Sequence, residues 1–275
     1  MTTTTTPTTA TPQARSQWRT GVQLLRAQLR HELQMRYVGS LAGAYWALIN
    51  PLVQVGVYVV LVTVIFKARL HGIGPSRFDY VIFVLAGMSG WLAMQEGIVM
   101  SSSSLTRHAD IVKNVIFPLE LLPLTAVLVS LISMGVSMTV LAFFVAISGF
   151  SVGWSLVCFP LLLLLQVALT LGAGLVLSIV TAFVRDMGLI LPILLQFVTL
   201  MTPILYSIAS MPPFLRTLTR LNPIYHLVQS YRAIFVAGVW PSPGGLLYVT
   251  IVAALLLALG LTVFRAAKGY VEALV

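Results

Sequence analysis

The stretch Arg36–Pro51, RYVGSLAGAYWALINP, contains the point at which the chain changes from polar to apolar. Arginine and glutamine are frequent before it, and residues 41–66 form an apolar run long enough for one membrane span. Its small residues allow close approach to a neighbouring helix. Asn50-Pro51 follows where the helix is already under way. Because proline removes one backbone hydrogen bond and crowds the preceding turn, we expect a kinked, closely packed first span.

The composition of the whole chain is that of an integral membrane protein. Of 275 residues, 59% are hydrophobic and only 8% are charged, against roughly 25% charged in ordinary soluble domains. Continuous apolar runs, rather than alternation, indicate helices instead of a barrel. The formal net charge of +9 is weak evidence for nucleic-acid binding. In a membrane protein, Lys and Arg residues beside the spans orient the spans and contact anionic lipid head groups, which accounts for a positive charge.

Six apolar runs predict an all-α protein with six transmembrane helices. The runs are roughly 41–66, 80–100, 119–147, 154–184, 189–206 and 246–264. An even number places both termini on one side of the membrane. With the N-terminus inside, ten Lys and Arg residues lie in cytoplasmic segments and six on the other side. This bias favours cytoplasmic termini.

Two segments before the first span differ in composition. Residues 1–14 are a Thr/Pro-rich, low-complexity tail that we expect to be disordered. Residues 15–38 place apolar residues at helical spacing on one face and basic residues on another, and they contain Trp18. That pattern predicts an amphipathic helix in the membrane interface, although a plain solvated helix is the alternative. Residues 39–275 then form the transmembrane domain.

Two connections within the transmembrane domain have distinctive chemistry. The segment 101–118 is polar and predicts a short cytoplasmic helix near 105–115. The segment 207–243 has short apolar pieces, Pro-Pro, Asn-Pro and spaced arginines, and its pieces are too short to cross a bilayer. We expect short re-entrant or amphipathic helices at the outer interface before the last span. A long external loop is the alternative.

The sequence contains no recognisable catalytic, cofactor or metal site. It has no G-x-x-x-x-G-K-[ST] phosphate loop, so ATP would have to be bound by another subunit. Cys158 is the single cysteine, and the four histidines lack zinc-ligand spacing. Among seven acidic residues no two share a helix face within a span. This scarcity argues against a membrane-embedded glycosyl- or acyltransferase, which is the alternative from another class.

Glu96 is the one ionisable residue that lies clearly within a predicted span. Charged groups at this depth are costly and mark functional sites by default. Glu96 either faces a translocation path or is a packed carboxyl, hydrogen-bonded to a neighbouring helix or close to the cytoplasmic interface.

Three parts of the sequence resemble one family. These are RYVGSLAGAYWALINPLVQV at the first span, the loop ending FPLELLPL, and the stretch RDMGLILPILLQFVTLMTPILYSIASMPPFLRTLTRLNPIYHLVQSYRAIF. They resemble the permease subunits of ABC-2 type exporters of polysaccharide and polyol-phosphate polymers. The resemblance covers nearly all of the chain after the tail. An ABC-2 permease for a small molecule or drug shares the six-span plan and is the alternative within this class.

The resemblance implies partners, a location and a mechanism. Such permeases form homodimers in the bacterial cytoplasmic membrane, and each copy docks a separately encoded ATPase subunit that would hold ATP and Mg. ATP hydrolysis would drive a lipid-linked polymer outward. The N-terminal interfacial helix would gate the entrance, and the helix near 105–115 would couple to the ATPase.

Candidate functional residues follow from these roles and from side-chain chemistry. Arginine suits phosphate or pyrophosphate head groups, and aromatic faces suit the C–H surface of sugar rings. The candidates are Arg26, Arg30 and Arg36 for the lipid head group; Arg107, His108, Asp110 and Lys113 for ATPase coupling; and Tyr45, Trp46, Tyr58, Phe66, Trp91 and Glu96 for the translocation path. Each aromatic residue could instead face lipid. Because His108 and Asp110 are two residues apart, a polar loop face is the alternative for that pair.

Overall fold

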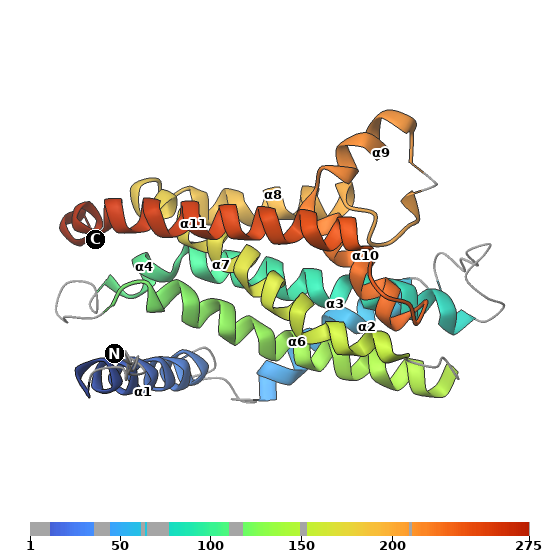
Figure 1. The fold of residues 1–275 in the computed structure, drawn as a ribbon, viewed down its shortest axis with the longest axis horizontal. Coiled ribbons are helices and arrows are strands. Elements are labelled where there is room, and N and C mark those ends of the chain that lie inside the picture. Colours follow the sequence, from blue (N-terminus) through green and yellow to red (C-terminus); the bar gives the residue numbers. More distant parts are fainter. Residues whose placement is uncertain are drawn as a thin grey trace, which may run out of the picture.

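The fold is a bundle of helices, seen here in a computed structural model (Figure 1). The structure describes residues 12–35, 45–61, 64, 77–109, 118–148, 153–208 and 211–274. Its elements are α1 (Pro12–Met35), α2 (Trp46–Val60), α3 (Arg77–Ser102), α4 (Ser104–Arg107), α6 (Leu121–Ser148), the 3-10 helix η3 (Trp154–Cys158), α7 (Phe159–Phe183), α8 (Met187–Met201), α9 (Pro213–Arg220), α10 (Pro223–Phe235) and α11 (Pro243–Leu274). No strand occurs in the described ranges, which confirms the all-α class there.

Four of the described helices are long and apolar enough to cross a membrane. These segments are Asp79–Ser102, Leu121–Ser148, Trp154–Phe183 and Pro243–Tyr270. The described parts of α2 and α8 supply shorter apolar stretches, Leu48–Val60 and Met187–Met201. The number of six spans therefore stays a prediction. Each of the six predicted apolar runs overlaps one of these apolar helices, although α11 continues to Leu274, well beyond the predicted end at 264, and the described α2 covers only part of 41–66.

Helix α3 forms the centre of the bundle. It packs against both α6 and α7, and α7 packs against α11. Its buried side chains include Ile82, Leu85, Met88 and Trp91, all less than 2% exposed. The outward faces of α6, α8 and α11 are instead apolar and exposed, as contact with lipid requires.

Two glycines allow α7 and α11 to approach closely. A Cβ atom added at Gly172 would lie 2.7 Å from the backbone of Leu256, and one at Gly260 would lie 2.6 Å from the Gly172 carbonyl oxygen. Backbones at this separation leave no room for a side chain, so small residues at this crossing determine how tightly the two helices pack.

The segment between α8 and α11 folds into the two short helices α9 and α10. Asn222 caps α10, because its side-chain oxygen accepts a hydrogen bond from the Ile224 amide at 2.9 Å. Helix α10 packs against α3 and α11 and buries Leu227, Val228 and Tyr231. The sequence correctly predicted short helices here, while their re-entry into the membrane stays a prediction.

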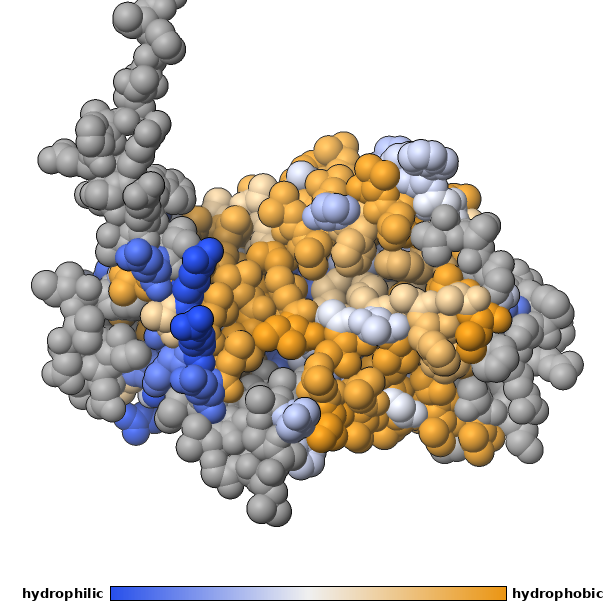
Figure 2. Space-filling view, turned by 90° about the horizontal axis from the view of Figure 1, so that it is seen from below, coloured by the Kyte–Doolittle hydropathy of each residue, from blue (hydrophilic) through white to orange (hydrophobic). Residues whose placement is uncertain are grey.

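Polar side chains gather at one end of the bundle. Helix α1, α4 and the last turns of α11 lie at this end in Figure 1, and α1 packs along α6. Figure 2 shows hydrophilic residues at the same end and a hydrophobic surface over most of the remaining described face. The surface therefore has the division that a protein at a membrane–water boundary needs.

Candidate functional site

An ion-pair cluster joins α1 to α4 at the polar end of the bundle. The His108 Nε2 atom lies 3.1 Å from Glu32 Oε2, and Arg107 NH1 lies 3.9 Å from Glu32 Oε1. The His31 ring centroid is 6.5 Å from that of His108. Glu32 thus connects the proposed gate helix to the start of the proposed coupling segment.

Local hydrogen bonds hold the α4 side chains in position. The Arg107 guanidinium donates through Nε to Ser103 Oγ at 3.0 Å and through NH2 to the Met100 carbonyl oxygen at 3.2 Å. His108 Nδ1 lies 2.9 Å from the Ser104 carbonyl oxygen. Since both ring nitrogens of His108 face acceptors, the protonated imidazolium can satisfy both contacts as a donor.

The contact between Glu32 and His108 shifts the pKa of each group. The hydrogen bond with Glu32 raises the pKa of His108 above its usual 6.5, although burial opposes this. The hydrogen bond with His108 lowers the pKa of Glu32 below its usual 4.5, with burial opposing and the charges of His108, Arg107 and His31 assisting. Both shifts favour the charged pair over the neutral one.

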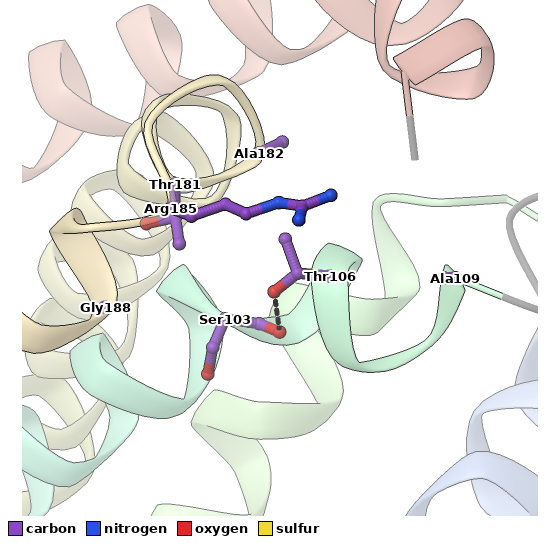
Figure 3. Close-up of a pocket in the computed structure, with 7 residues that line it drawn as sticks. All are labelled: Ser103, Thr106, Ala109, Thr181, Ala182, Arg185 and Gly188. Atoms are coloured by element: carbon purple, nitrogen blue, oxygen red, sulfur yellow. Dashed lines mark hydrogen bonds between the residues drawn. The ribbon is translucent and has the colours of Figure 1, made fainter.

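On the inner side of α4, a pocket of about 350 Å³ opens between α4, the end of α7 and the start of α8. Its polar lining comes from Ser103, Thr106, Thr181 and Arg185. Figure 3 shows the Arg185 side chain reaching from the end of α7 towards Thr106. Thr181 is 3% exposed, and its hydroxyl has no hydrogen-bond partner within the described chain. The pocket can accept a polar or anionic group at this end of the bundle.

The second pocket lies deeper, where α2, α3 and α6 meet. Its volume is about 210 Å³, and it is lined by Asn50, Gln54, Leu92, Gln95, Glu96, Val99 and Ser133. Glu96 is thus placed in a polar pocket on α3, and it also engages another residue. The sequence singled out Glu96, but not the amide side chains around it.

Helix α1 separates apolar from basic side chains. Leu29 and Leu33 pack against the cluster of Met100, Ala126 and Val129. Arg26 and Arg30 are exposed, so both are available to anionic groups. Arg36, Asp110 and Lys113 lie outside the described residues, as does most of the predicted 105–115 helix beyond α4.

The aromatic path candidates occupy different environments. Tyr45 and Trp46 are exposed at the start of α2, with 73% of Tyr45 accessible, and Tyr58 is half-buried. Trp91 is 1% exposed inside the bundle, where its Nε1 donates to Thr199 Oγ1 at 2.7 Å. Phe66 lies outside the described residues.

Two buried polar residues of α10 escaped the sequence reasoning. With cytoplasmic termini, Arg232 falls among the six Lys and Arg residues of external segments, but its side chain is buried, at 4% exposed. It donates to the carbonyl oxygens of Phe83, Pro203 and Ile204. The Tyr231 hydroxyl donates to Gln166 Oε1 at 2.7 Å. In the sequence, only the apolar residues around Arg232 indicate that this arginine is internal.

The described part of the chain combines four helices that are long and apolar enough to cross a membrane with a polar cluster at one end, which is the architecture of a multi-pass membrane protein. The sequence model of the ABC-2 type transporter family matches residues 23–236. The chain therefore belongs to the ABC-2 type transporter family.

Individual relatives agree with this membership over most of the chain. The chain is 28% identical over 247 residues to the O-antigen export system permease protein RfbA of Myxococcus xanthus, covering 89% of this chain and 92% of the relative. It is 25% identical over 208 residues to a Klebsiella pneumoniae protein of the same name, covering 75% and 78%. A further Klebsiella pneumoniae protein of that name is 25% identical over 240 residues, covering 86% and 89%.

Proposed function

We propose that this chain is the transmembrane permease subunit of an ABC exporter that moves a lipid-linked polysaccharide or related polymer from the cytoplasmic side outward. The observation that carries the proposal is similarity over 75–89% of the chain to three O-antigen export permeases. Because the sequence contains no phosphate loop, a separate ATPase subunit would hold ATP and Mg.

The proposed assembly contains two copies of this chain and two copies of the ATPase in the bacterial cytoplasmic membrane, with both termini cytoplasmic. The polar end of the bundle, where α1 and α4 lie, would then face the cytoplasm. This orientation agrees with the excess of Lys and Arg in the segments assigned to that side.

Within this assembly, α1 would act as the gate and α4 with the residues after it as the ATPase contact. Arg26, Arg30 and Arg36 would bind the phosphate groups of the lipid carrier, because guanidinium forms strong paired hydrogen bonds with phosphate. Arg107, His108, Asp110 and Lys113 would contact the ATPase. Tyr45, Trp46, Tyr58, Phe66, Trp91 and Glu96 stay candidates for the path of the polymer.

The test is purification of the tagged chain from its own host in mild detergent, combined with analysis of surface polysaccharide in a strain lacking the gene. We expect an ATPase at about one copy per permease in quantitative mass spectrometry, and loss of one surface polysaccharide that the restored gene returns. A chain purified without an ATPase, together with unchanged surface polysaccharide after deletion, would contradict the proposal.

A further inference from the structure

The pocket between α2, α3 and α6 concentrates hydrogen-bonding side chains in a membrane domain, and Asn50 and Gln54 are exposed on its α2 side. Three carboxamides, one carboxylate and one hydroxyl face a volume of about 210 Å³, from Asn50, Gln54, Gln95, Glu96 and Ser133. Among the residues that the structure describes, no lysine or arginine lines it. Such a grouping is unusual at membrane depth, where polar side chains are retained for pairing or for function.

These polar groups come from helical positions that share a face. Asn50 and Gln54 are four residues apart on α2, and the α3 lining residues Leu92, Gln95, Glu96 and Val99 follow a three-and-four spacing. Ser133 of α6 closes the remaining side. Gln95 lies about two helical turns before the end of α3 at Ser102. The pocket therefore opens within the half of the bundle that is nearer to α4.

The amides of the pocket are available to a ligand. Within the described parts of the chain, the side chains of Asn50, Gln54 and Gln95 form no hydrogen bond with another residue. Glu96 already has an interaction of its own, so the inference rests on the amides. A carboxamide offers two donors and one acceptor oxygen in a plane.

Sugar hydroxyl groups match this chemistry. Each hydroxyl donates one hydrogen bond and accepts others, so neighbouring hydroxyls of one ring can pair with both ends of a carboxamide. The apolar side chains of Leu92 and Val99 suit the C–H face of the same ring. One carboxylate with three neutral amides and no basic residue suits a neutral polyhydroxylated ligand better than a phosphate.

We propose that this pocket is a sugar-binding subsite, in which Asn50, Gln54 and Gln95 hydrogen-bond hydroxyl groups of the polymer as it enters from the α4 side of the bundle. The proposal rests on the proposed export function and adds the place and the side chains that contact the sugar. It assigns the amides a role separate from that of the arginines on α1, which would hold the phosphate of the carrier lipid.

The test replaces two amides with apolar side chains of similar size, in the double variant Gln54→Leu/Gln95→Leu. We expect surface polysaccharide export to fall by about tenfold or more, because the hydrogen bonds of two carboxamides to the sugar are lost. ATPase co-purification and dimer formation should not change. The control is Thr250→Val, an exposed position on α11 whose hydroxyl bonds only within its own helix, to Leu246 O at 2.8 Å; it should export normally.

A second measurement locates the sugar directly. The photoreactive residue p-benzoylphenylalanine at Leu92 should capture polysaccharide in living cells, whereas the same residue at the exposed Phe143 of α6 should capture lipid only. If the double variant fails to accumulate, this cross-linking experiment still decides whether the polysaccharide enters the pocket.

The outcomes distinguish failure of the pocket proposal from failure of the exporter proposal on which it rests. If gene deletion removes the polysaccharide but the double variant exports normally, or if Leu92 captures no sugar, the pocket proposal is wrong and the exporter proposal stands. Loss of the dimer in the double variant would show that the amides pair with the second copy, which also overturns the pocket proposal. If deletion leaves every polysaccharide unchanged, the exporter proposal itself fails.

Discussion

Glu32 forms ion pairs that connect α1 to Arg107 of α4 and to the adjacent His108. It is largely buried and faces His108 at 3.1 Å, with Arg107 at 3.9 Å on its other oxygen. A hydrogen-bonded pair of opposite charges is worth more than a fully exposed one, although the partial exposure of this pair reduces its value. The contact therefore gives α1 a specific attachment in addition to the packing of Leu29 and Leu33.

The first prediction concerns this attachment. Glu32→Gln should weaken the docking of α1 by about 1–2 kcal/mol, since it removes the charge that pairs with His108. Hydrogen exchange of α1 amides, measured by mass spectrometry, should become roughly 5- to 30-fold faster. Gln34→Ala, at an exposed position of the same helix, is the control and should change little. Equal exchange in both variants would contradict an anchoring role for Glu32.

The second prediction is a pH dependence of the same contact. The lowered pKa of Glu32 adds stability that is present above its ordinary value of 4.5 and is lost as pH falls through the lowered pKa. The raised pKa of His108 adds stability that is full below its ordinary value of 6.5 and is lost as pH rises through the raised pKa. The contact is therefore strongest between about pH 4.5 and 6.5.

Protection of α1 from exchange, corrected for intrinsic rates, should accordingly be greater at pH 5.5 than at pH 8.5. In Glu32→Gln this difference should largely disappear. A wild-type protein whose α1 protection is the same at both pH values would show that the pair does not control α1.

At the scale of whole elements, the crossing of α7 and α11 decides the packing of the bundle. The backbone of α11 at Leu256 occupies the space that a side chain at Gly172 would need. Helices in a membrane associate through such close contacts, because lipid supplies no hydrophobic driving force between them.

The third prediction follows from this crossing. Gly172→Ala should lower the free energy of unfolding by about 1–3 kcal/mol, because the added methyl group forces the two backbones apart. Gly135→Ala on α6 is the matched control, since a Cβ atom there meets nothing within 4 Å; helix propensity makes it neutral or stabilising by up to about 1 kcal/mol. Unfolding titrations with sodium dodecyl sulfate measure both, and equal effects would contradict the crossing argument.

At the scale of the whole molecule, the bundle is divided into a polar end and an apolar body, and the proposed orientation would place the ATPase at the polar end. The polar end holds α1 and α4 (Figures 1 and 2). A basic group such as Arg107, half exposed beside Glu32, offers a charged contact to a partner outside the membrane.

The fourth prediction tests the proposed ATPase contact. Charge reversal in Arg107→Glu/Lys113→Glu should reduce the ATPase recovered with the purified chain by about tenfold or more, because the change inverts the charge complementarity of the proposed contact. Arg220→Glu, an exposed position on α9, is the control and should leave recovery unchanged. Normal recovery with the double reversal would remove the coupling role from this segment.

The sequence by itself determined the all-helical class of the fold, the approximate positions of its apolar helices and the resemblance to the family. Long apolar runs in a chain with so few charges have no stable alternative to helices in lipid. Proline and asparagine marked the start of α10, because Asn222 supplies the cap and Pro223 needs no donor there. Glu96 also stood out from the sequence, since a single carboxylate within a span is conspicuous.

Only the tertiary structure decided which distant residues meet. Glu32 and His108 belong to separate helices, so no local pattern could pair them, and the apparent neighbour Asp110 drew attention away from Glu32. Arg232 looked like an external charge until the carbonyl groups of Phe83, Pro203 and Ile204 were seen around it. The amide pocket likewise needs three helices at one place. Helical periodicity fixes which face a residue occupies, but packing alone fixes what that face contacts.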